Sequence, residues 1–203
     1  MAKLVLILGG VRSGKSRFAQ DLAQKISGDD VLFVATAEAG DAEMSRRIQI
    51  HRTSRPATWP TLEAAHDVGA RIQQTVDNRQ TILIDCLTLL VSNVLLSCGD
   101  LPDPNIAEQR VDAEIKGLLA ACDQRQGTVI IVSGEVGLGV VPESSLGRLY
   151  RDLLGWANQA VAARSDATYL MVAGLPLELK SLALSVEQAA SIIGKQKQSC
   201  NEQ

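Results

Sequence analysis

An eight-residue glycine-rich segment near the start of the chain leaves few folds open. It consists of Gly9, Gly10, Val11, Arg12, Ser13, Gly14, Lys15 and Ser16, and it matches the pattern G-x-x-x-x-G-K-[ST]. An apolar run precedes the segment and helical periodicity follows it. In such a unit the backbone N–H groups of the loop and the N-terminus of the helix bind phosphate groups. The segment predicts a site for a nucleoside triphosphate; the alternative is a glycine turn that merely precedes a helix.

Short apolar runs alternate with longer helical patterns along the whole chain. The runs cover residues 4–8, 31–35, 81–84, 128–132 and 168–172, and helical spacing covers residues 16–26, 62–76, 106–122 and 146–163. The runs are continuously apolar, which is typical of parallel strands covered by helices on both faces. The alternation predicts an α/β fold with a mainly parallel sheet flanked by helices.

No internal repeat or linker divides the chain. Residues 99–105 hold two prolines and two aspartates, which is typical of a surface loop, and the last dozen residues are polar. We therefore expect one domain over residues 1–203, with a frayed C-terminal tail within residues 181–203.

Charge and composition weigh against several classes of protein. The net charge is -3 and aromatic residues make up 3% of the chain, whereas nucleic-acid binders usually carry a basic excess. No apolar stretch approaches the ~20 residues of a membrane span. The four cysteines, Cys86, Cys98, Cys122 and Cys200, form no C-x-x-C pair and are expected to be reduced and mostly buried. We expect a cytoplasmic protein without a nucleic-acid partner or a membrane span.

Three residues are candidates for the chemistry of the triphosphate. Lys15 would reach the β- and γ-phosphates, and the Ser16 hydroxyl would bind Mg²⁺. Asp85 ends the apolar run 81–84, which is where a P-loop enzyme places the carboxylate that holds Mg²⁺ or its water. The alternative for Asp85 is a helix N-cap or a turn residue.

The middle of the chain contains a histidine among arginines. A helix over residues 41–51 would put Arg47 and His51 one turn apart on the same face. Nearby arginines favour the neutral imidazole, which is the nucleophilic form. The alternative is a surface or capping histidine. We expect no catalytic role for His66, which has no clustered partners on the helix predicted for residues 62–76.

A second glycine-rich segment follows the run 128–132. Residues 133–142 lead into a helix that carries Arg148, Arg151 and Asn158. A loop at the carboxyl edge of a parallel sheet is where such folds bind ligands. The alternative is a solvated helix with a flexible entry loop.

Taken together, these segments resemble the bifunctional adenosylcobinamide kinase / adenosylcobinamide-phosphate guanylyltransferase family of cobalamin biosynthesis. The resemblance covers roughly residues 4–180 and is carried by Gly9-Gly10-x-Arg12-Ser13-Gly14-Lys15-Ser16, Ala35-Thr36-Ala37, Asp41-x-Glu43-Met44-x-x-Arg47-Ile48, His51-Arg52-x-x-Arg55-Pro56-x-x-Trp59-x-Thr61-x-Glu63, Asp85-Cys86-Leu87-Thr88 and Glu135-Val136-Gly137-x-Gly139-x-Val141-Pro142. Gly134 departs from the asparagine that many family members have before the Glu135 position.

The resemblance implies a RecA-like P-loop NTPase fold, a homotrimer and two reactions. ATP or GTP would phosphorylate the aminopropanol hydroxyl of adenosylcobinamide, and GTP would then transfer GMP to that phosphate, with Mg²⁺ as cofactor. The second step would pass through guanylylated His51. Besides the P-loop, the resemblance implies nucleotide contacts for Ala35, Thr36, Ala37, His51, Arg52, Thr53, Ser54, Glu63 and Asp85.

Two other functions are compatible with the P-loop. One is a small-molecule kinase without the guanylyltransferase step, in which His51 is structural. The other is a nucleotide-dependent switch or a DNA-stimulated ATPase of RecA type, which the acidic net charge of -3 disfavours.

Overall fold

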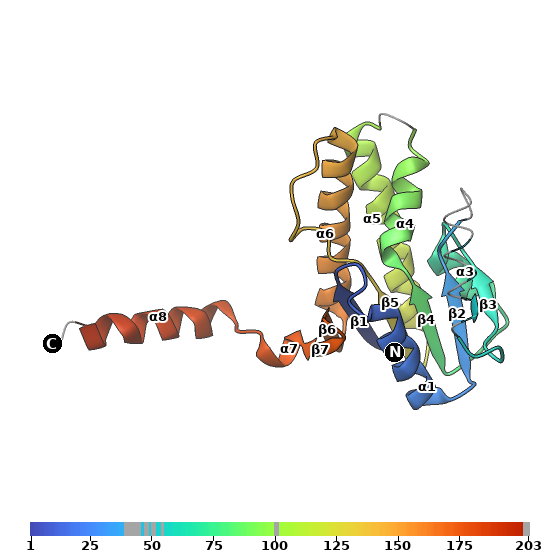
Figure 1. Cartoon of the computed structure of the whole chain (residues 1–203), viewed down its shortest axis with the longest axis horizontal. Helices are drawn as coiled ribbons and strands as arrows, with labels where there is room; N and C mark the ends of the chain where they lie inside the picture. The colour runs from blue at the N-terminus through green and yellow to red at the C-terminus, as the bar shows by residue number, and fades with distance from the viewer. Residues whose placement is uncertain (39–45, 47–48, 50–51, 54, 100–101, 201–203) are drawn as a thin grey trace.

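The computed structural model describes residues 1–38, 46, 49, 52–53, 55–99 and 102–200. Its strands and helices, labelled in Figure 1, are β1 (Lys3–Gly9), α1 (Lys15–Ser27), β2 (Val31–Ala35), β3 (Thr61–Glu63), α3 (Val68–Gln74), β4 (Thr81–Asp85), α4 (Leu87–Leu96), α5 (Pro104–Gln124), β5 (Thr128–Val132), α6 (Ser145–Arg164), β6 (Ala167–Val172), β7 (Leu175–Glu178), α7 (Leu179–Leu182) and α8 (Val186–Cys200).

The strands form one seven-stranded sheet in the order β3-β2-β4-β5-β1-β6-β7. Every neighbouring pair is parallel except β6 and β7, which are antiparallel. β5 lies between β1, which leads into the glycine-rich segment, and β4, which ends at Asp85. This order is the RecA-like arrangement of a P-loop fold, so the predicted fold class is confirmed.

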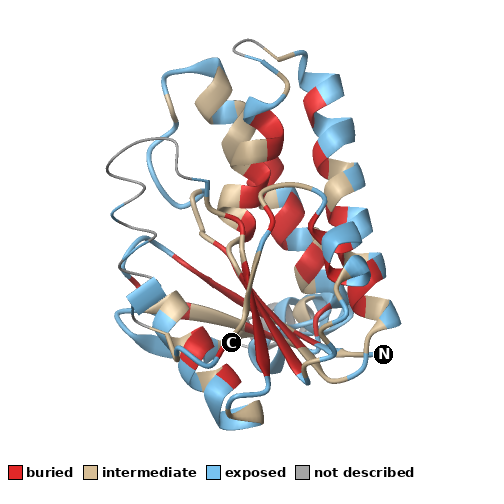
Figure 2. Ribbon diagram, turned by 90° about the vertical axis from the view of Figure 1, so that its right-hand side faces the viewer, coloured by how far each residue is buried: buried red, intermediate tan, exposed pale blue. Residues whose placement is uncertain are grey.

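Both faces of the sheet are buried, as the continuously apolar runs predict. Alternate residues of the central strands point to opposite faces; in β1, for example, Leu6 packs on one side and Ile7 on the other. The first side is covered by α3, α4, α5 and α6, and the second by α1 together with Trp59. The buried strands therefore run through the centre of the molecule in Figure 2.

Several predicted boundaries are wrong, for identifiable reasons. The helix predicted for residues 62–76 is shorter, since Thr61–Glu63 pairs with β2 as a strand and the helix begins at Val68. The loop predicted for residues 99–105 ends earlier, because the Asp103 side chain accepts from two backbone N–H groups and Pro104 starts α5. The tail is not simply frayed, because it contains α8. The helix predicted for residues 41–51 lies almost wholly outside the described residues.

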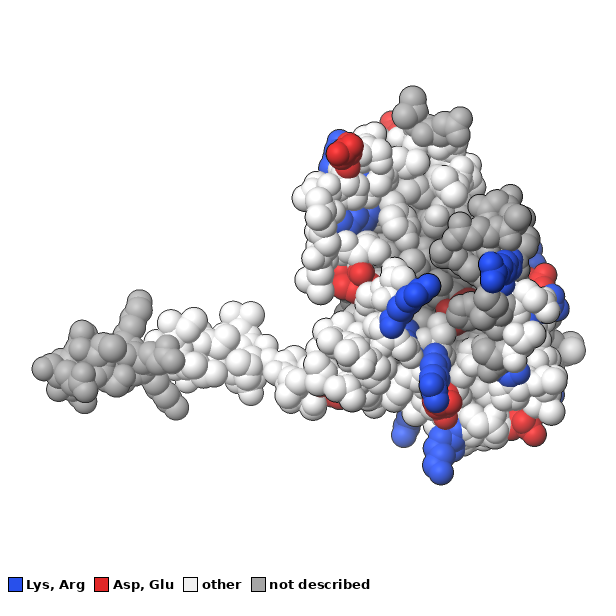
Figure 3. Space-filling model, viewed as in Figure 1, with Lys and Arg blue, Asp and Glu red and all other residues white. Residues whose placement is uncertain are grey.

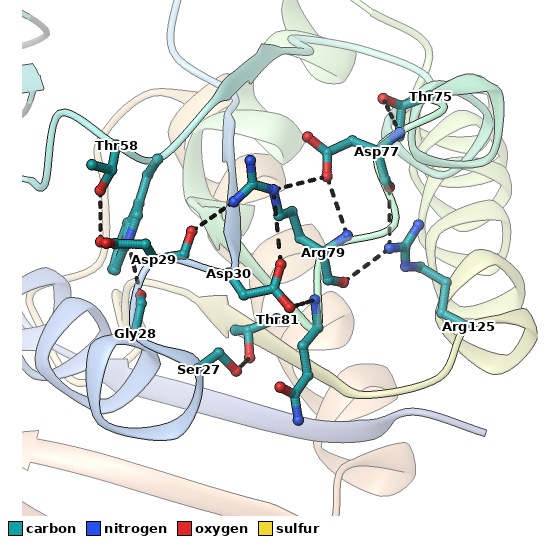
Figure 4. A network of polar contacts seen from close by, with 12 residues as sticks. Ser27, Gly28, Asp29, Asp30, Thr58, Thr75, Asp77, Arg79, Thr81 and Arg125 are labelled. Carbon is teal, nitrogen blue, oxygen red and sulfur yellow. Dashed lines mark hydrogen bonds and ion pairs between the residues drawn. The ribbon is translucent and has the colours of Figure 1, made fainter.

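A network of charged groups fixes the amino edge of the sheet (Figure 4). Arg79 donates to the carbonyl oxygen of Asp29 at 2.8 Å, and its Nε lies 3.4 Å from the Asp77 carboxylate and 3.8 Å from that of Asp30. Arg125 donates to the carbonyl oxygens of Asp77 and Arg79 at 3.3 and 3.2 Å. These contacts tie together the chain segments that enter β2, β4 and β5, so they hold the edge opposite to the one where the strands end.

The C-terminal elements lie outside the layered body. α7 follows β7 at the edge of the sheet, and α8 extends away from the rest of the molecule in Figure 1. Among the described helices, none combines the length and the hydropathy needed to cross a membrane.

Candidate nucleotide site

The carboxyl ends of the parallel strands open into a cavity of about 900 Å³. The last residues of five strands line it, namely Gly9, Ala35, Glu63, Asp85 and Val132. In open α/β sheets, ligands bind in the crevice beyond the carboxyl ends of the strands. The fold thus brings candidate site residues from three segments, 9–16, 35–63 and 133–142, to the same cavity.

The glycine-rich segment is fixed in shape by close backbone contacts. A Cβ atom on Gly9, whose φ is +151°, would lie 2.6 Å from the carbonyl oxygen of Met171 and 2.7 Å from Ser13 Oγ. The backbone N–H of Glu135 donates to the Gly9 carbonyl at 3.0 Å, and that of Gly174 donates to the Ser13 carbonyl at 3.0 Å. No larger residue fits at Gly9 without a shift of its neighbours, so the turn requires glycine there.

Lys15 begins α1 and faces the cavity. Its Nζ donates to the carbonyl oxygen of Gly10 at 2.6 Å. Burial lowers the pKa of Lys15 from its ordinary value of 10.5, while Cys86 and Asp85 act in the opposite direction. An anionic group placed beside Lys15 would favour its charged form, so the position suits a phosphate.

The oxygen donors at the cavity suit Mg²⁺. Ser16 and Asp85 both line it, and hydroxyl and carboxylate oxygens are the ligands that Mg²⁺ prefers. Within the described residues, no group of three or more His, Cys, Asp or Glu side chains could hold a metal on its own. Two protein donors fit an ion that takes its remaining ligands from substrate phosphates and water.

Thr36, which was predicted to contact the nucleotide, forms hydrogen bonds within the protein instead. Its hydroxyl donates to the carbonyl oxygen of Cys86 and accepts from the Cys86 backbone N–H, both at 2.7 Å. The Asn93 amide donates to the Thr36 carbonyl at 2.8 Å. The fully buried Thr36 therefore joins the ends of β2 and β4, and its neighbours Ala35 and Ala37 line the cavity in its place.

Two cysteines, Cys86 and Cys122, are not activated. Cys122 is buried, and Cys86 and Cys98 are partly buried free thiols. Burial raises the pKa of Cys86 from 9.0 to about 11 and that of Cys122 from 9.0 to about 12. Both thiols stay protonated at neutral pH, which is unfavourable for a nucleophile.

Basic side chains near β3, the strand at one edge of the sheet, also line the cavity. Arg52, Arg55, His66 and Arg71 line it together with the P-loop. Arg55 donates to Thr61 Oγ1 at 2.8 Å, and its guanidinium carbon lies 4.1 Å from the centroid of the Phe33 ring. The candidate set from the sequence did not include Arg55, His66 or Arg71. His66 was expected in a helix over residues 62–76 without clustered partners, whereas it lies between β3 and α3.

The second glycine-rich segment is anchored by buried polar contacts. Ser133 Oγ donates to Asn158 Oδ1 at 2.6 Å, and Asn158 Nδ2 donates to the Gly134 carbonyl at 3.0 Å. The Gly134 N–H donates to Thr88 Oγ1. Arg148 is not among the residues that line the cavity, and it donates to the carbonyl oxygens of Pro142 and Glu143. Asn158 and Arg148 thus hold the loop in place.

The structure therefore groups most of the predicted residues. Those that line the cavity are Gly9, Val11, Arg12, Lys15, Ser16, Ala35, Ala37, Arg52, Glu63 and Asp85. Those that are described but do not line it are Gly10, Ser13, Gly14, Thr36 and Thr53. His51 and Ser54 lie outside the described residues.

Comparisons with known proteins relate the chain to one family. The model of a family described as cobinamide kinase / cobinamide phosphate guanyltransferase matches residues 5–179. The chain is 47% identical to the bifunctional adenosylcobalamin biosynthesis protein CobP of Pseudomonas aeruginosa over 86% of this chain and 96% of the relative. It is 38% identical to the bifunctional adenosylcobalamin biosynthesis protein CobU of Escherichia coli over 87% of this chain and 99% of the relative. Among solved structures, the flagellar accessory protein FlaH of Methanocaldococcus jannaschii matches 83% of this chain and 70% of its own, with a TM-score of 0.45 and 14% identity.

Proposed function

The chain belongs to the cobinamide kinase / cobinamide phosphate guanyltransferase family, and from that premise we propose that one domain catalyses both reactions at the cavity described above. The first reaction is phosphorylation of the aminopropanol hydroxyl of adenosylcobinamide by ATP or GTP. The second is transfer of GMP from GTP to the resulting phosphate.

In the first reaction, the P-loop holds the triphosphate. The backbone N–H groups of residues 9–16 surround the phosphates, and Lys15 stabilises the charge that develops on the β- and γ-phosphates. The acceptor hydroxyl oxygen forms a bond to the γ-phosphorus and the bond to the β,γ-bridging oxygen breaks, so the nucleoside diphosphate leaves. The hydroxyl proton passes to a base or to water. Ser16 and Asp85 would hold a Mg²⁺ ion that neutralises phosphate charge.

In the second reaction, His51 is the nucleophile. A ring nitrogen forms a bond to the α-phosphorus of GTP, and the bond to the α,β-bridging oxygen breaks, so pyrophosphate leaves. A phosphate oxygen of adenosylcobinamide phosphate then attacks the same phosphorus, the P–N bond breaks, and adenosylcobinamide-GDP forms. Covalent catalysis divides one difficult transfer into two displacements.

Two clusters of basic side chains line the same cavity, and this observation carries the proposal. Lys15 and Arg12 contribute from the P-loop side, and Arg52, Arg55 and Arg71 contribute from the side of β3 and α3. A kinase alone needs the first group for its triphosphate. The second group adds cations that suit a second phosphorylated ligand, because arginine binds phosphate through paired hydrogen bonds. The position of Arg52 directly after His51 in the sequence supports a role for His51 at this cavity.

The proposal includes an assembly and a location. We infer a homotrimer from the family resemblance, and a cytoplasmic location because both reactions consume nucleoside triphosphates. The resemblance also assigns nucleotide contacts to Thr36, Thr53 and Ser54. For Thr36 we infer a positioning role for Ala35 and Ala37 instead, since its hydroxyl, N–H and carbonyl oxygen all bond within the protein.

Product analysis tests the two-step function. The purified chain is incubated with Mg²⁺ and adenosylcobinamide, with ATP alone, with GTP alone, or with both, and the corrinoids are separated and identified by mass. We expect adenosylcobinamide phosphate with ATP alone and adenosylcobinamide-GDP wherever GTP is present. Phosphorylated corrinoid without any GDP derivative would reduce the protein to a kinase. Nucleotide hydrolysis without corrinoid products would contradict both reactions.

A further inference from the structure

The loop between β5 and α6 exposes apolar side chains beside the nucleotide cavity. Leu138 is 87% exposed, Val140 is 94% exposed and Val141 is 59% exposed. Residues 136–142 carry no charged side chain. In Figure 3, isolated charged side chains lie among uncharged residues on the side of α6, whereas Lys and Arg side chains gather over α1. A cluster of exposed apolar side chains commonly marks a binding site, so the loop is a candidate binding surface.

The same loop is held firmly at both ends. At its start, the Glu135 N–H donates to the Gly9 carbonyl at 3.0 Å, which places the loop against the P-loop. At its end, Arg148 donates to the Pro142 carbonyl at 3.0 Å and to the Glu143 carbonyl at 2.6 Å. Between these anchors, the Gly137 N–H donates to the Glu135 carboxylate. The exposed apolar residues are therefore presented next to the phosphate-binding segment.

The chemistry of phosphoryl transfer requires the acceptor to lie beside this loop. The attacking oxygen must meet the γ-phosphate in line, so the molecule that carries it has to approach the open end of the P-loop. Val11 lines the cavity there and is 93% exposed. Glu135 and Val136 line the same cavity at the start of the loop. A large acceptor whose hydroxyl enters the cavity must rest the remainder of its body on this rim.

We propose that Val11 together with residues 136–141 forms the docking surface for the corrin ring. This inference rests on the proposed function, since it identifies where that site binds its acceptor. A corrinoid is a rigid macrocycle fringed with methyl groups and neutral amide side chains, and it matches an uncharged apolar rim better than a nucleotide or a nucleic acid does. The amides can also accept or donate hydrogen bonds with the exposed backbone of this glycine-rich loop.

A matched pair of substitutions tests the docking surface. The double variant Leu138→Ser/Val140→Ser removes the exposed apolar groups of the loop. The control Val76→Ser changes a valine that is 96% exposed, between α3 and β4 and away from the cavity lining. All of these side chains are exposed, so the variants should unfold at the same temperature as the wild type. Steady-state phosphorylation of adenosylcobinamide is then measured with ATP and corrinoid varied in turn.

We expect the KM for adenosylcobinamide to rise about tenfold in the double variant, because two buried contacts with the ring are lost. The KM for ATP should not change, and Val76→Ser should match the wild type. An unchanged KM for the corrinoid would overturn the docking surface while leaving the proposed function intact. Wild-type protein that never phosphorylates the corrinoid would overturn both. Light scattering on the same samples tests whether the loop instead contacts a second copy of the chain. Dissociation of an oligomer with an unchanged KM would make the loop a contact between copies and overturn the proposal.

Discussion

Lys15 combines a structural and a chemical constraint in one side chain. It is partly buried at the start of α1, its Nζ donates to the Gly10 carbonyl at 2.6 Å, and burial lowers its pKa. A desolvated ammonium without a bound anion contributes little to folding stability. The position of Lys15 is therefore explained better by ligand binding than by folding.

We predict that Lys15→Met lowers the rate of phosphoryl transfer by at least about 100-fold, because a charge that stabilises the transition state is removed. The unfolding temperature should not fall, since an apolar side chain of similar length replaces a desolvated charge. Arg17→Met is the control, because Arg17 lies in the same helix but is exposed and pairs only at 3.8 Å with the exposed Asp21. Rates and thermal unfolding of both variants check this prediction. Equal rates for Lys15→Met and the wild type would remove Lys15 from the mechanism.

At the scale of the elements, the contact between α3 and α5 depends on the lack of a side chain at one position. A Cβ atom on Gly69 would lie 2.3 Å from the carbonyl oxygen of Gly117 and 2.8 Å from the backbone nitrogen of Leu118. Gly117 itself, in the same contact, has open space where its own Cβ would lie. The two glycines therefore differ sharply in what they tolerate.

Gly69→Ala should reduce the free energy of unfolding by about 1–3 kcal/mol, because the two helices must move apart. Gly117→Ala should leave it unchanged or raise it by up to about 1 kcal/mol, because alanine is the better helix former. Urea unfolding of the two variants checks the difference. If both variants lost the same stability, the close approach of α3 to α5 would not be the cause.

The elements also explain which parts of the fold were predictable. The cores of β1, β2, β4 and β5 are continuously apolar and were predicted within a residue or two of their observed bounds. α4 (Leu87–Leu96) was missed because its sequence is apolar on nearly every side and has no helical period. β3 was missed because it is only three residues long and pairs with β2 alone.

The residues of the candidate site also divide into those that the sequence predicts and those that only the fold brings to the cavity. The P-loop follows from a motif and Asp85 from the end of an apolar run, so the sequence predicted the residues of these two segments that line the cavity. His66 and Arg71 belong to the same cavity only because β3 lies at the far end of the sheet and α3 follows it. Strand order is not visible in a single sequence, so these two residues could not be assigned to the site beforehand.

At the scale of the whole molecule, the C-terminal region consists of β7, which pairs within the sheet, and α8, which lies outside it. β7 pairs with β6, and the Glu178 carboxylate accepts from the Thr168 N–H at 3.1 Å. By contrast, Val186, Ile192 and Ile193 in α8 are exposed. The family match ends at residue 179, before α8 begins.

Removal of residues 185–203 should therefore change the free energy of unfolding by no more than about 0.5 kcal/mol and leave both reactions intact, because few buried contacts are lost. A chain that ends after Gly174 should be clearly less stable, since it lacks the strand that pairs with β6. Chemical denaturation and product analysis compare the two truncations with the full chain. Loss of activity on removal of α8 alone would assign that helix a function.

The transfer of GMP through His51 is the central claim, and covalent labelling tests it most directly. The protein and Mg²⁺ are incubated with GTP labelled at the α-phosphate, or at the γ-phosphate in a parallel sample, and the denatured chain is analysed for label. We predict an α-label that is acid-labile and base-stable, as a phosphoramidate is, and that is absent in His51→Ala while kinase activity remains. A chain that acquires no α-label, yet still transfers the γ-phosphate to cobinamide, would contradict the account and leave a kinase alone.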